Sequence, residues 1–159
     1  VEFLGSSNTS GDSMSVAEVL PKPIFGPITL EDMRGNELLT RTVLPLVRDV
    51  CKHTKGRFTV ESVAQGLASG AYGLWGVMRP PANLEAVTVT AVAGEVFDIL
   101  IVGPDFEEVF PFLPMLAGSA RAAKCKRMRL TGPGFWRKHL PMGESNWKVA
   151  AMVYERELI

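Results

Sequence analysis

The sequence predicts one α/β domain whose sheet is mixed, mostly antiparallel and flanked by helices. Segments with helical and strand-like spacing follow one another in the order helix, helix, three strands, helix, strand, helix, strand. This order is typical of a layered α/β architecture. The length of 159 residues suits one domain, and no internal repeat divides it. We expect residues 24–159 to form this domain and residues 1–23 to form a flexible or extended N-terminal arm.

The N-terminal arm is rich in serine and glycine, with Pro21 and Pro23 near its end. Because such a segment buries little apolar surface, we expect it to be flexible alone and ordered when it lies against a partner in an assembly. Met14 is an alternative natural start, which would make residues 1–13 an upstream remnant.

Two helices are predicted before the main sheet. Apolar residues at helical spacing run from Asn36 to His53, and Pro45 interrupts them, which predicts a helix with a kink or a restart at the proline. Thr59 is suited to cap a second helix, which ends at Gly70.

Three strand-like runs follow, and the turns between them predict an antiparallel meander. Asp105 then caps an amphipathic helix whose first turns are made irregular by Pro111 and Pro114. The expected strands are Tyr72–Met78, Leu84–Val92, Glu95–Val102, Lys126–Thr131 and Trp147–Leu158. A last short helix is expected at Phe135–Leu140.

Composition excludes several classes of protein. The 17 basic and 17 acidic residues cancel, which argues against a generally basic nucleic-acid binder. Cys51 and Cys125 lie far apart with no Cys or His at ligand spacing, so no metal site is predicted. No apolar run approaches the roughly 20 residues that span a bilayer, and the first residues do not read as a signal peptide. We therefore expect no membrane partner and no secretion by a signal peptide.

The C-terminal third carries a resemblance to a known family. The run Ala120–Leu140 has an Ala-Arg…Cys helix end, a short strand and a Gly-x-Gly-Phe-Trp turn, and the chain ends in Tyr154-Glu155-Arg156-Glu157-Leu158-Ile159. With the element order, these residues resemble the GNAT superfamily of N-acetyltransferases. They are most similar to small GNAT-like proteins of tailed bacteriophages and prophages. The resemblance covers about residues 28–159.

The resemblance implies where a cofactor would bind. In the family the fourth strand offers backbone hydrogen bonds to the pantetheine of acetyl-CoA, and a glycine-rich loop at the next helix holds the pyrophosphate. Val96–Val102 would be the fourth strand, and the family's first strand either lies in the Ile24–Leu30 region or has no visible signal. The candidate cofactor-binding residues are Val102, Gly103, Asp105 and Phe106.

The loop of this chain departs from the family pattern. Pro104 has no N–H to donate, the glycine pair is missing, and Asp105, Glu107 and Glu108 place carboxylates where phosphates would lie. The same acids also suit the first turn of any helix. The prediction is therefore that no cofactor binds, with acetyl-CoA as the alternative.

Catalysis in this family needs a base and often a phenolic acid. Glu85 and Asp98 are the candidate bases, and Tyr154 is the candidate acid. Glu85 stands at the start of a strand, where a carboxylate is ordinarily solvated, and Tyr154 also reads as a half-buried sheet residue. None of the three stands out as catalytic.

Charge is distributed unevenly along the chain. Between Arg121 and Lys148 there are eight basic residues and one acid, whereas the first 33 residues hold five acids and one base. A solvated surface explains the cluster; the alternative is a docking face for an acidic partner or for phosphates. The candidate partner-binding residues are Arg121, Lys124, Lys126, Arg127, Arg129, Trp136, Arg137 and Lys138.

The degenerate loop and the uneven charge favour a non-catalytic structural or binding module of a phage particle or its assembly. Its partners would be portal, capsid or tail components, contacted through the arm and the basic C-terminal third. Such a protein would reside in the cytoplasm of the bacterial host or in the virion. The alternative is an acetyl-CoA-dependent N-acetyltransferase with a divergent cofactor loop, and a third hypothesis is a nucleic-acid binder.

Overall fold

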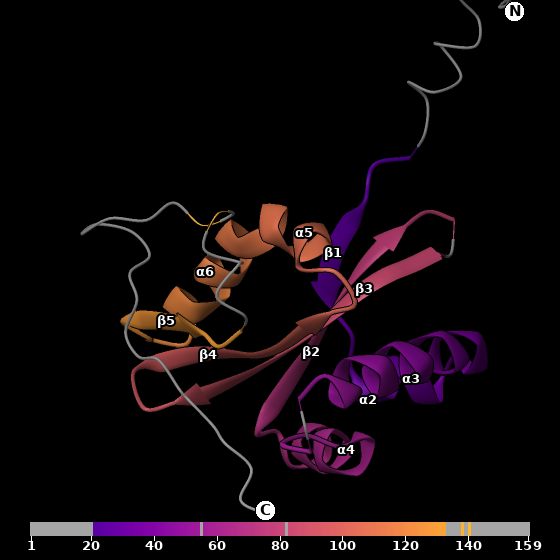
Figure 1. Ribbon diagram of the computed structural model, residues 1–159, viewed down its shortest axis with the longest axis horizontal. Coiled ribbons are helices and arrows are strands. Elements are labelled where there is room, and N and C mark those ends of the chain that lie inside the picture. Colours follow the sequence, from indigo (N-terminus) through magenta and orange to yellow (C-terminus); the bar gives the residue numbers. More distant parts are fainter. Residues whose placement is uncertain (1–20, 55, 82, 133–137, 139, 141–159) are drawn as a thin grey trace, which may run out of the picture.

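The computed structural model describes residues 21–54, 56–81, 83–132, 138 and 140. These residues form a five-stranded sheet in the order β1-β2-β3-β4-β5 (Figure 1). The first four strands pair antiparallel and β5 runs parallel to β4. The predicted fold class and the antiparallel meander are confirmed. The strands are β1 Ile24–Pro27, β2 Tyr72–Arg79, β3 Asn83–Ala93, β4 Val96–Gly103 and β5 Arg127–Leu130.

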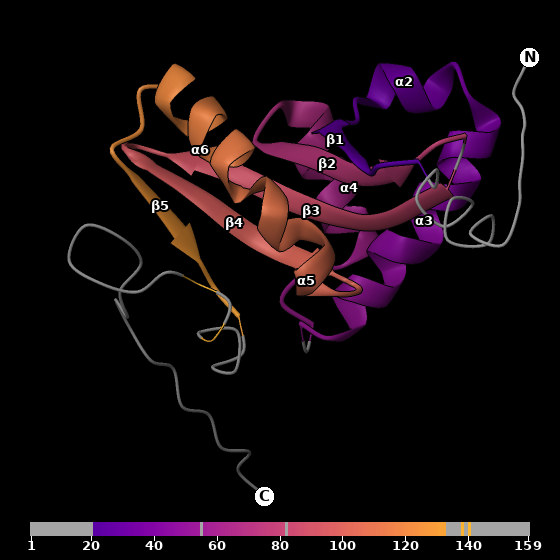
Figure 2. The same cartoon turned by 90° about the horizontal axis from the view of Figure 1, so that it is seen from above.

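Helices cover both faces of the sheet (Figures 1 and 2). One apolar cluster joins α3 and α4 to β2, β3 and β4, and a second joins α5 and α6 to the opposite face. The burial of these two clusters supplies the main driving force for the fold. The helices are α2 Leu30–Arg34, α3 Glu37–Lys52, α4 Val60–Ser69, α5 Phe106–Val109, the 3-10 turn η1 Phe110–Phe112 and α6 Leu113–Ala122.

The helix starts follow local capping chemistry. Thr59 accepts a hydrogen bond from Ser62 N, and Gly70 ends α4 with a left-handed φ of 81°, both as predicted. Helix α2 was not predicted, although Thr29 and Asp32 form a capping box that is readable in the sequence.

Helix α3 corrects one expectation. It contains Pro45 but continues to Lys52 as one helix, so the alternative of a restart at the proline is wrong. Val43 and Val47, on either side of Pro45, are both buried against the sheet, and Pro45 itself is exposed. Packing of this apolar stripe therefore outweighs the missing backbone donor.

The first strand lies at Ile24–Pro27, within the region where the family resemblance placed it.

The turns after Asp105 are irregular as predicted, because η1 separates α5 from α6 at Pro111. Some expectations fall outside the described residues: the last strand Trp147–Leu158, most of the helix Phe135–Leu140, and the arm up to residue 20.

A β-bulge alters the direction of the side chains in β4. The register against β3 shifts between Val89 and Thr90, so β4 has one extra residue. As a result Leu100 and Ile101, which are consecutive, both contact the cluster of α3 and α4, while Val102 returns to the other face. The buried hydroxyl of Thr88 donates to the carbonyl of Ile101 at 2.8 Å and fixes this geometry.

Candidate functional site

Strand β4 is paired with β5 over only the first half of its length, whereas all of β5 is paired. Val96–Ile99 pairs with Arg127–Leu130, and no further pairing to β5 is formed by Leu100–Gly103 in the described part of the chain. Strand β5 ends at Leu130, whereas β4 continues to Gly103 (Figure 2). A strand edge without a partner leaves alternate N–H and C=O groups able to bind an extended ligand.

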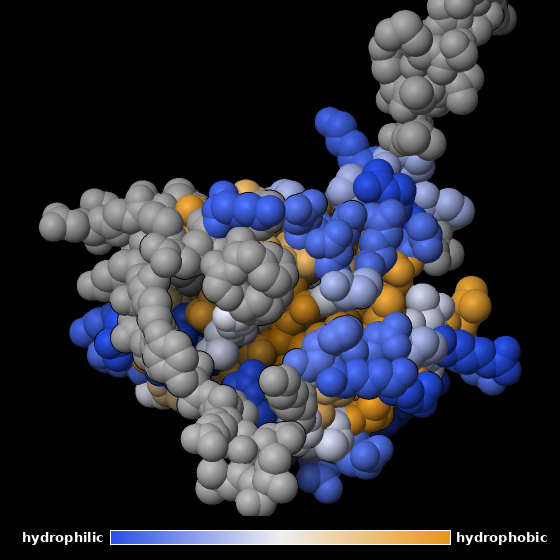
Figure 3. Space-filling view, in the orientation of Figure 1, coloured by the Kyte–Doolittle hydropathy of each residue, from blue (hydrophilic) through white to orange (hydrophobic). Residues whose placement is uncertain are grey.

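The surface near this edge is apolar. The space-filling view shows hydrophobic side chains between the layer of α5 and α6 and the layer of α2 and α3 (Figure 3). An extended ligand at the β4 edge would therefore meet backbone hydrogen-bonding groups beside apolar side chains, a combination that suits a chain carrying amides and methylenes.

In the loop after β4, two backbone N–H groups already donate hydrogen bonds to Asp105 within the loop. Gly103–Pro104 is a cis peptide bond, and Pro104 has no N–H. The carboxylate of Asp105 accepts from Glu107 N at 3.1 Å, and Glu108 N donates to Asp105 O at 3.2 Å. A diphosphate at this position would compete with the Asp105 carboxylate for Glu107 N and with the Asp105 carbonyl for Glu108 N, and it would meet the carboxylate's charge.

Gly103 has a packing explanation. A Cβ atom built on it would lie 2.8 Å from Cγ2 of Val50, on α3. The space in the Cβ direction of this glycine is therefore filled by Val50 of α3, so close helix packing is sufficient to explain the glycine. Two other predicted cofactor-binding residues, Val102 and Phe106, have exposed fractions of only 9% and 3% and lie in the cluster with α6. A diphosphate does not fit the loop.

Asp98 and Arg129, predicted for different roles, form one ion pair. They are register partners on β4 and β5, and the guanidinium donates to both carboxylate oxygens, at 2.6 and 2.8 Å. Asp98 is buried, whereas the Arg129 side chain is 56% exposed. Hydrogen bonding and charge from Asp98 raise the pKa of Arg129 above its usual value. With both oxygens engaged, Asp98 is poorly placed to act as a base.

Glu85 is less exposed than its position in the sequence suggested. It is the extra residue in a second bulge, because Val77 pairs with Ala86 and Met78 with Leu84. Its Oε2 accepts from Arg79 Nε at 3.0 Å, while Oε1 is buried and has no hydrogen-bond partner in the described part of the chain. The expectation of a solvated carboxylate is corrected: the bulge directs Glu85 into a partly enclosed position.

Glu85 and Gly103 lie at the same end of the sheet, because Val87 pairs with Gly103 and Glu85 precedes Val87 by two residues on β3. The acids of the Asp105 loop lie at this end too. Tyr154, the predicted phenolic acid, is outside the described residues.

The basic residues divide into paired and unpaired groups. Lys126 pairs with Glu95 at 3.2 Å, and Arg129 is held by Asp98. Arg121, Lys124 and Arg127 are exposed and form no ion pair with any described residue. Lys138 is exposed as well, whereas Trp136 and Arg137 fall among the residues that the structure leaves undescribed.

Other reactive groups offer no site. Cys51 and Cys125 are free thiols, and burial, with a smaller effect of the Glu61 charge, raises the pKa of Cys51. No group of His, Cys, Asp and Glu within the described ranges could hold a metal ion. None of the helices described is long and apolar enough to cross a membrane.

Comparison with known proteins identifies the fold. No family model and no curated protein sequence matches the chain. Among solved structures, a ribosomal-protein-alanine N-acetyltransferase from Brucella melitensis biovar Abortus 2308 is similar, with 14% identity and a TM-score of 0.57. That match covers 84% of this chain and 100% of the other.

Two further structures have the same architecture. An aminoglycoside acetyltransferase from an uncultured soil metagenomic sample, in complex with sisomicin, has 10% identity and a TM-score of 0.54 over 85% of this chain and 97% of its own. A predicted acetyltransferase from Clostridium acetobutylicum, with acetyl-CoA, has 11% identity and a TM-score of 0.51. That match covers 82% of this chain and 96% of the other. The chain therefore has the fold of the GNAT acetyltransferases. These matches do not bear on a phage origin, which stays a prediction.

Proposed function

We propose that this protein is an N-acetyltransferase with a divergent cofactor site, which binds an acyl thioester mainly through its pantetheine arm. The observation that carries the proposal is that the described pairing of β4 with β5 ends at Ile99 and Leu130, while β4 continues to Gly103. The edge at Leu100–Gly103 suits the amides of an extended pantetheine arm, which would add to the sheet as a short strand does. The GNAT fold supports this placement, since a structure with that fold contains acetyl-CoA.

The nucleotide half of CoA has no comparable support. Because Asp105 occupies the loop donors and Gly103 packs on Val50, the diphosphate would lie outside the loop, near exposed carboxylates. Like charges at such a distance disfavour binding, and salt screens this repulsion. The proposal therefore separates recognition of the thioester arm from recognition of the nucleotide.

Among the described carboxylates, Glu85 is the one that we propose as the base. The Oε1 atom of Glu85 has no hydrogen-bond partner among the described residues. Glu85 lies at the end of the sheet where β4 ends at Gly103. In the proposed reaction this oxygen would accept the proton that the acceptor amine loses. Arg79 would keep the carboxylate oriented through Oε2.

Calorimetric titration with acetylpantetheine and acetyl-CoA tests the proposal. We expect acetylpantetheine to bind at least as tightly as acetyl-CoA in low salt, and the difference to shrink as salt is added, because the repulsion is electrostatic. Asp105→Asn keeps a good N-cap side chain but removes a charge. This variant should strengthen acetyl-CoA binding and leave acetylpantetheine binding unchanged. Tighter binding of acetyl-CoA than of acetylpantetheine to the unmodified chain would contradict the proposal.

The unpaired cations favour a second candidate, a non-catalytic binding module. Arg121, Lys124 and Arg127 lie between the end of α6 and the start of β5, and exposed cations without an ion pair to any described residue suit an acidic partner. Absence of binding for both thioesters at millimolar concentration would favour this module. Phage portal, capsid or tail components and nucleic acid remain the predicted partners for it.

A further inference from the structure

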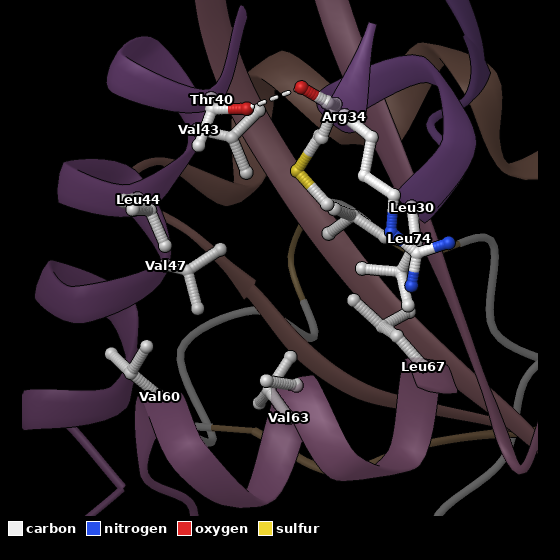
Figure 4. A pocket seen from close by; sticks show the side chains of 12 residues that line it. Leu30, Arg34, Thr40, Val43, Leu44, Val47, Val60, Val63, Leu67 and Leu74 are labelled. Carbon is white, nitrogen blue, oxygen red and sulfur yellow. Dashed lines mark hydrogen bonds between the residues drawn. The ribbon is translucent and has the colours of Figure 1, made fainter. Parts of the chain in front are cut away.

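A cavity of about 340 Å³ lies on the face of the sheet opposite α5 and α6 (Figure 4). It is lined by residues of α2, α3 and α4 and by Leu74 of β2. Its walls include Val43 and Val63, which are almost fully buried, while Leu44 on α3 is 39% exposed. The cavity is thus closed at its inner side and open at its rim. Its volume is at the lower end of the range for small-molecule sites, about 300–1,000 Å³.

The lining of this cavity is apolar apart from two residues. Thr40 has its hydroxyl engaged, because it donates to Met33 O at 2.7 Å. Arg34 is the other, and it forms no ion pair with any residue in the described ranges. Figure 4 shows its side chain extending from α2 toward Leu67 of α4. The apolar cavity thus has at its edge a cation that pairs with no described residue.

We propose that this cavity binds a medium-chain carboxylate, with the hydrocarbon tail among the buried valines and the carboxylate on Arg34. The apolar walls favour the tail because its burial removes hydrocarbon from water. A guanidinium pairs well with a carboxylate, often through two hydrogen bonds. The volume limits the tail to a single short chain.

This site is separate from the proposed thioester site. Leu74 lies on β2, and β3 stands between β2 and β4 in the sheet order. The carboxylate site therefore does not depend on whether β4 binds pantetheine, and either proposal can fail alone.

Titration of the full chain with octanoate by calorimetry tests this proposal. We expect binding that tightens by up to about fourfold for each added methylene from hexanoate to decanoate, until the cavity is full. Octanol should bind about tenfold more weakly than octanoate, since it lacks the charge. Arg34→Gln should remove this preference and keep the dependence on chain length.

Two alanines on α4 provide a matched pair of variants. Both are exposed, but Ala64 lines the cavity and Ala68 does not. Ala64→Phe places a ring at the open side of the cavity and should abolish or strongly weaken octanoate binding, while Ala68→Phe should leave it unchanged. Circular dichroism and thermal unfolding would show that both variants fold.

Three results would overturn the proposal. The first is absence of octanoate binding at millimolar concentration, and the second is equal binding to both alanine variants. The third is a dimer that Ala64→Phe dissociates while octanoate has no effect on the unmodified chain, because a second copy would then occupy the cavity.

Discussion

Gly103→Ala is expected to destabilise the protein by about 1–3 kcal/mol, the usual cost of inserting a methyl group into a packed site. The added Cβ would lie 2.8 Å from Cγ2 of Val50, a branched side chain that is itself buried between α3 and the sheet. Urea denaturation monitored by circular dichroism would measure the free energy of unfolding.

The partner residue provides the control for this prediction. Val50→Ala removes the methyl groups that the new Cβ meets, so the double variant should lose less stability than the sum of the two single variants. Gly118, on α6, has no atom within 4 Å of a built Cβ, and Gly118→Ala should stabilise the protein by up to about 1 kcal/mol through helix propensity. Purely additive effects of the Gly103 and Val50 changes would contradict the packing explanation.

Arg129→Met is expected to lower the melting temperature by several degrees, because it leaves the buried carboxylate of Asp98 without its partner. Both oxygens of that carboxylate accept from the guanidinium. Removal of one member of a buried pair is costly mainly through the charge that remains. Differential scanning calorimetry near neutral pH would measure the effect.

Arg127→Met is the matched control for this change. Arg127 lies on the same strand, two residues away, and forms no ion pair with a described residue. We expect its replacement to have little effect. Adding Asp98→Asn to Arg129→Met removes the stranded charge and should restore part of the loss. Equal melting temperatures for the two methionine variants would show that the ion pair does not stabilise the sheet.

Much of the fold could be predicted from local sequence signals. Helix α4 begins after Thr59 and ends at Gly70, and both residues act as helix caps through contacts within a few residues of the chain. The meander follows from short turns between strand-like runs. Helix α3 shows the limit of this reasoning, because Pro45 predicts an interruption and only the buried stripe on both sides of it explains a continuous helix.

The site was less accessible to sequence reasoning. The departure of the Asp105 loop from the family pattern is visible in the sequence, whereas the contact of Gly103 with Val50 depends on how α3 packs. The Asp98–Arg129 pair joins residues that only the parallel pairing of β4 and β5 brings together. Glu85 is partly enclosed because of a bulge, and the sequence contains no clear signal for that register shift.

Hydrogen–deuterium exchange with acetylpantetheine tests the central claim most directly, since it reports where the thioester arm binds. We expect slower exchange in the peptide covering Leu100–Gly103, because its edge amides would donate to the ligand. The other edge strand, β1 at Ile24–Pro27, should be unaffected. Saturable binding that leaves exchange in Leu100–Gly103 unchanged would contradict the account.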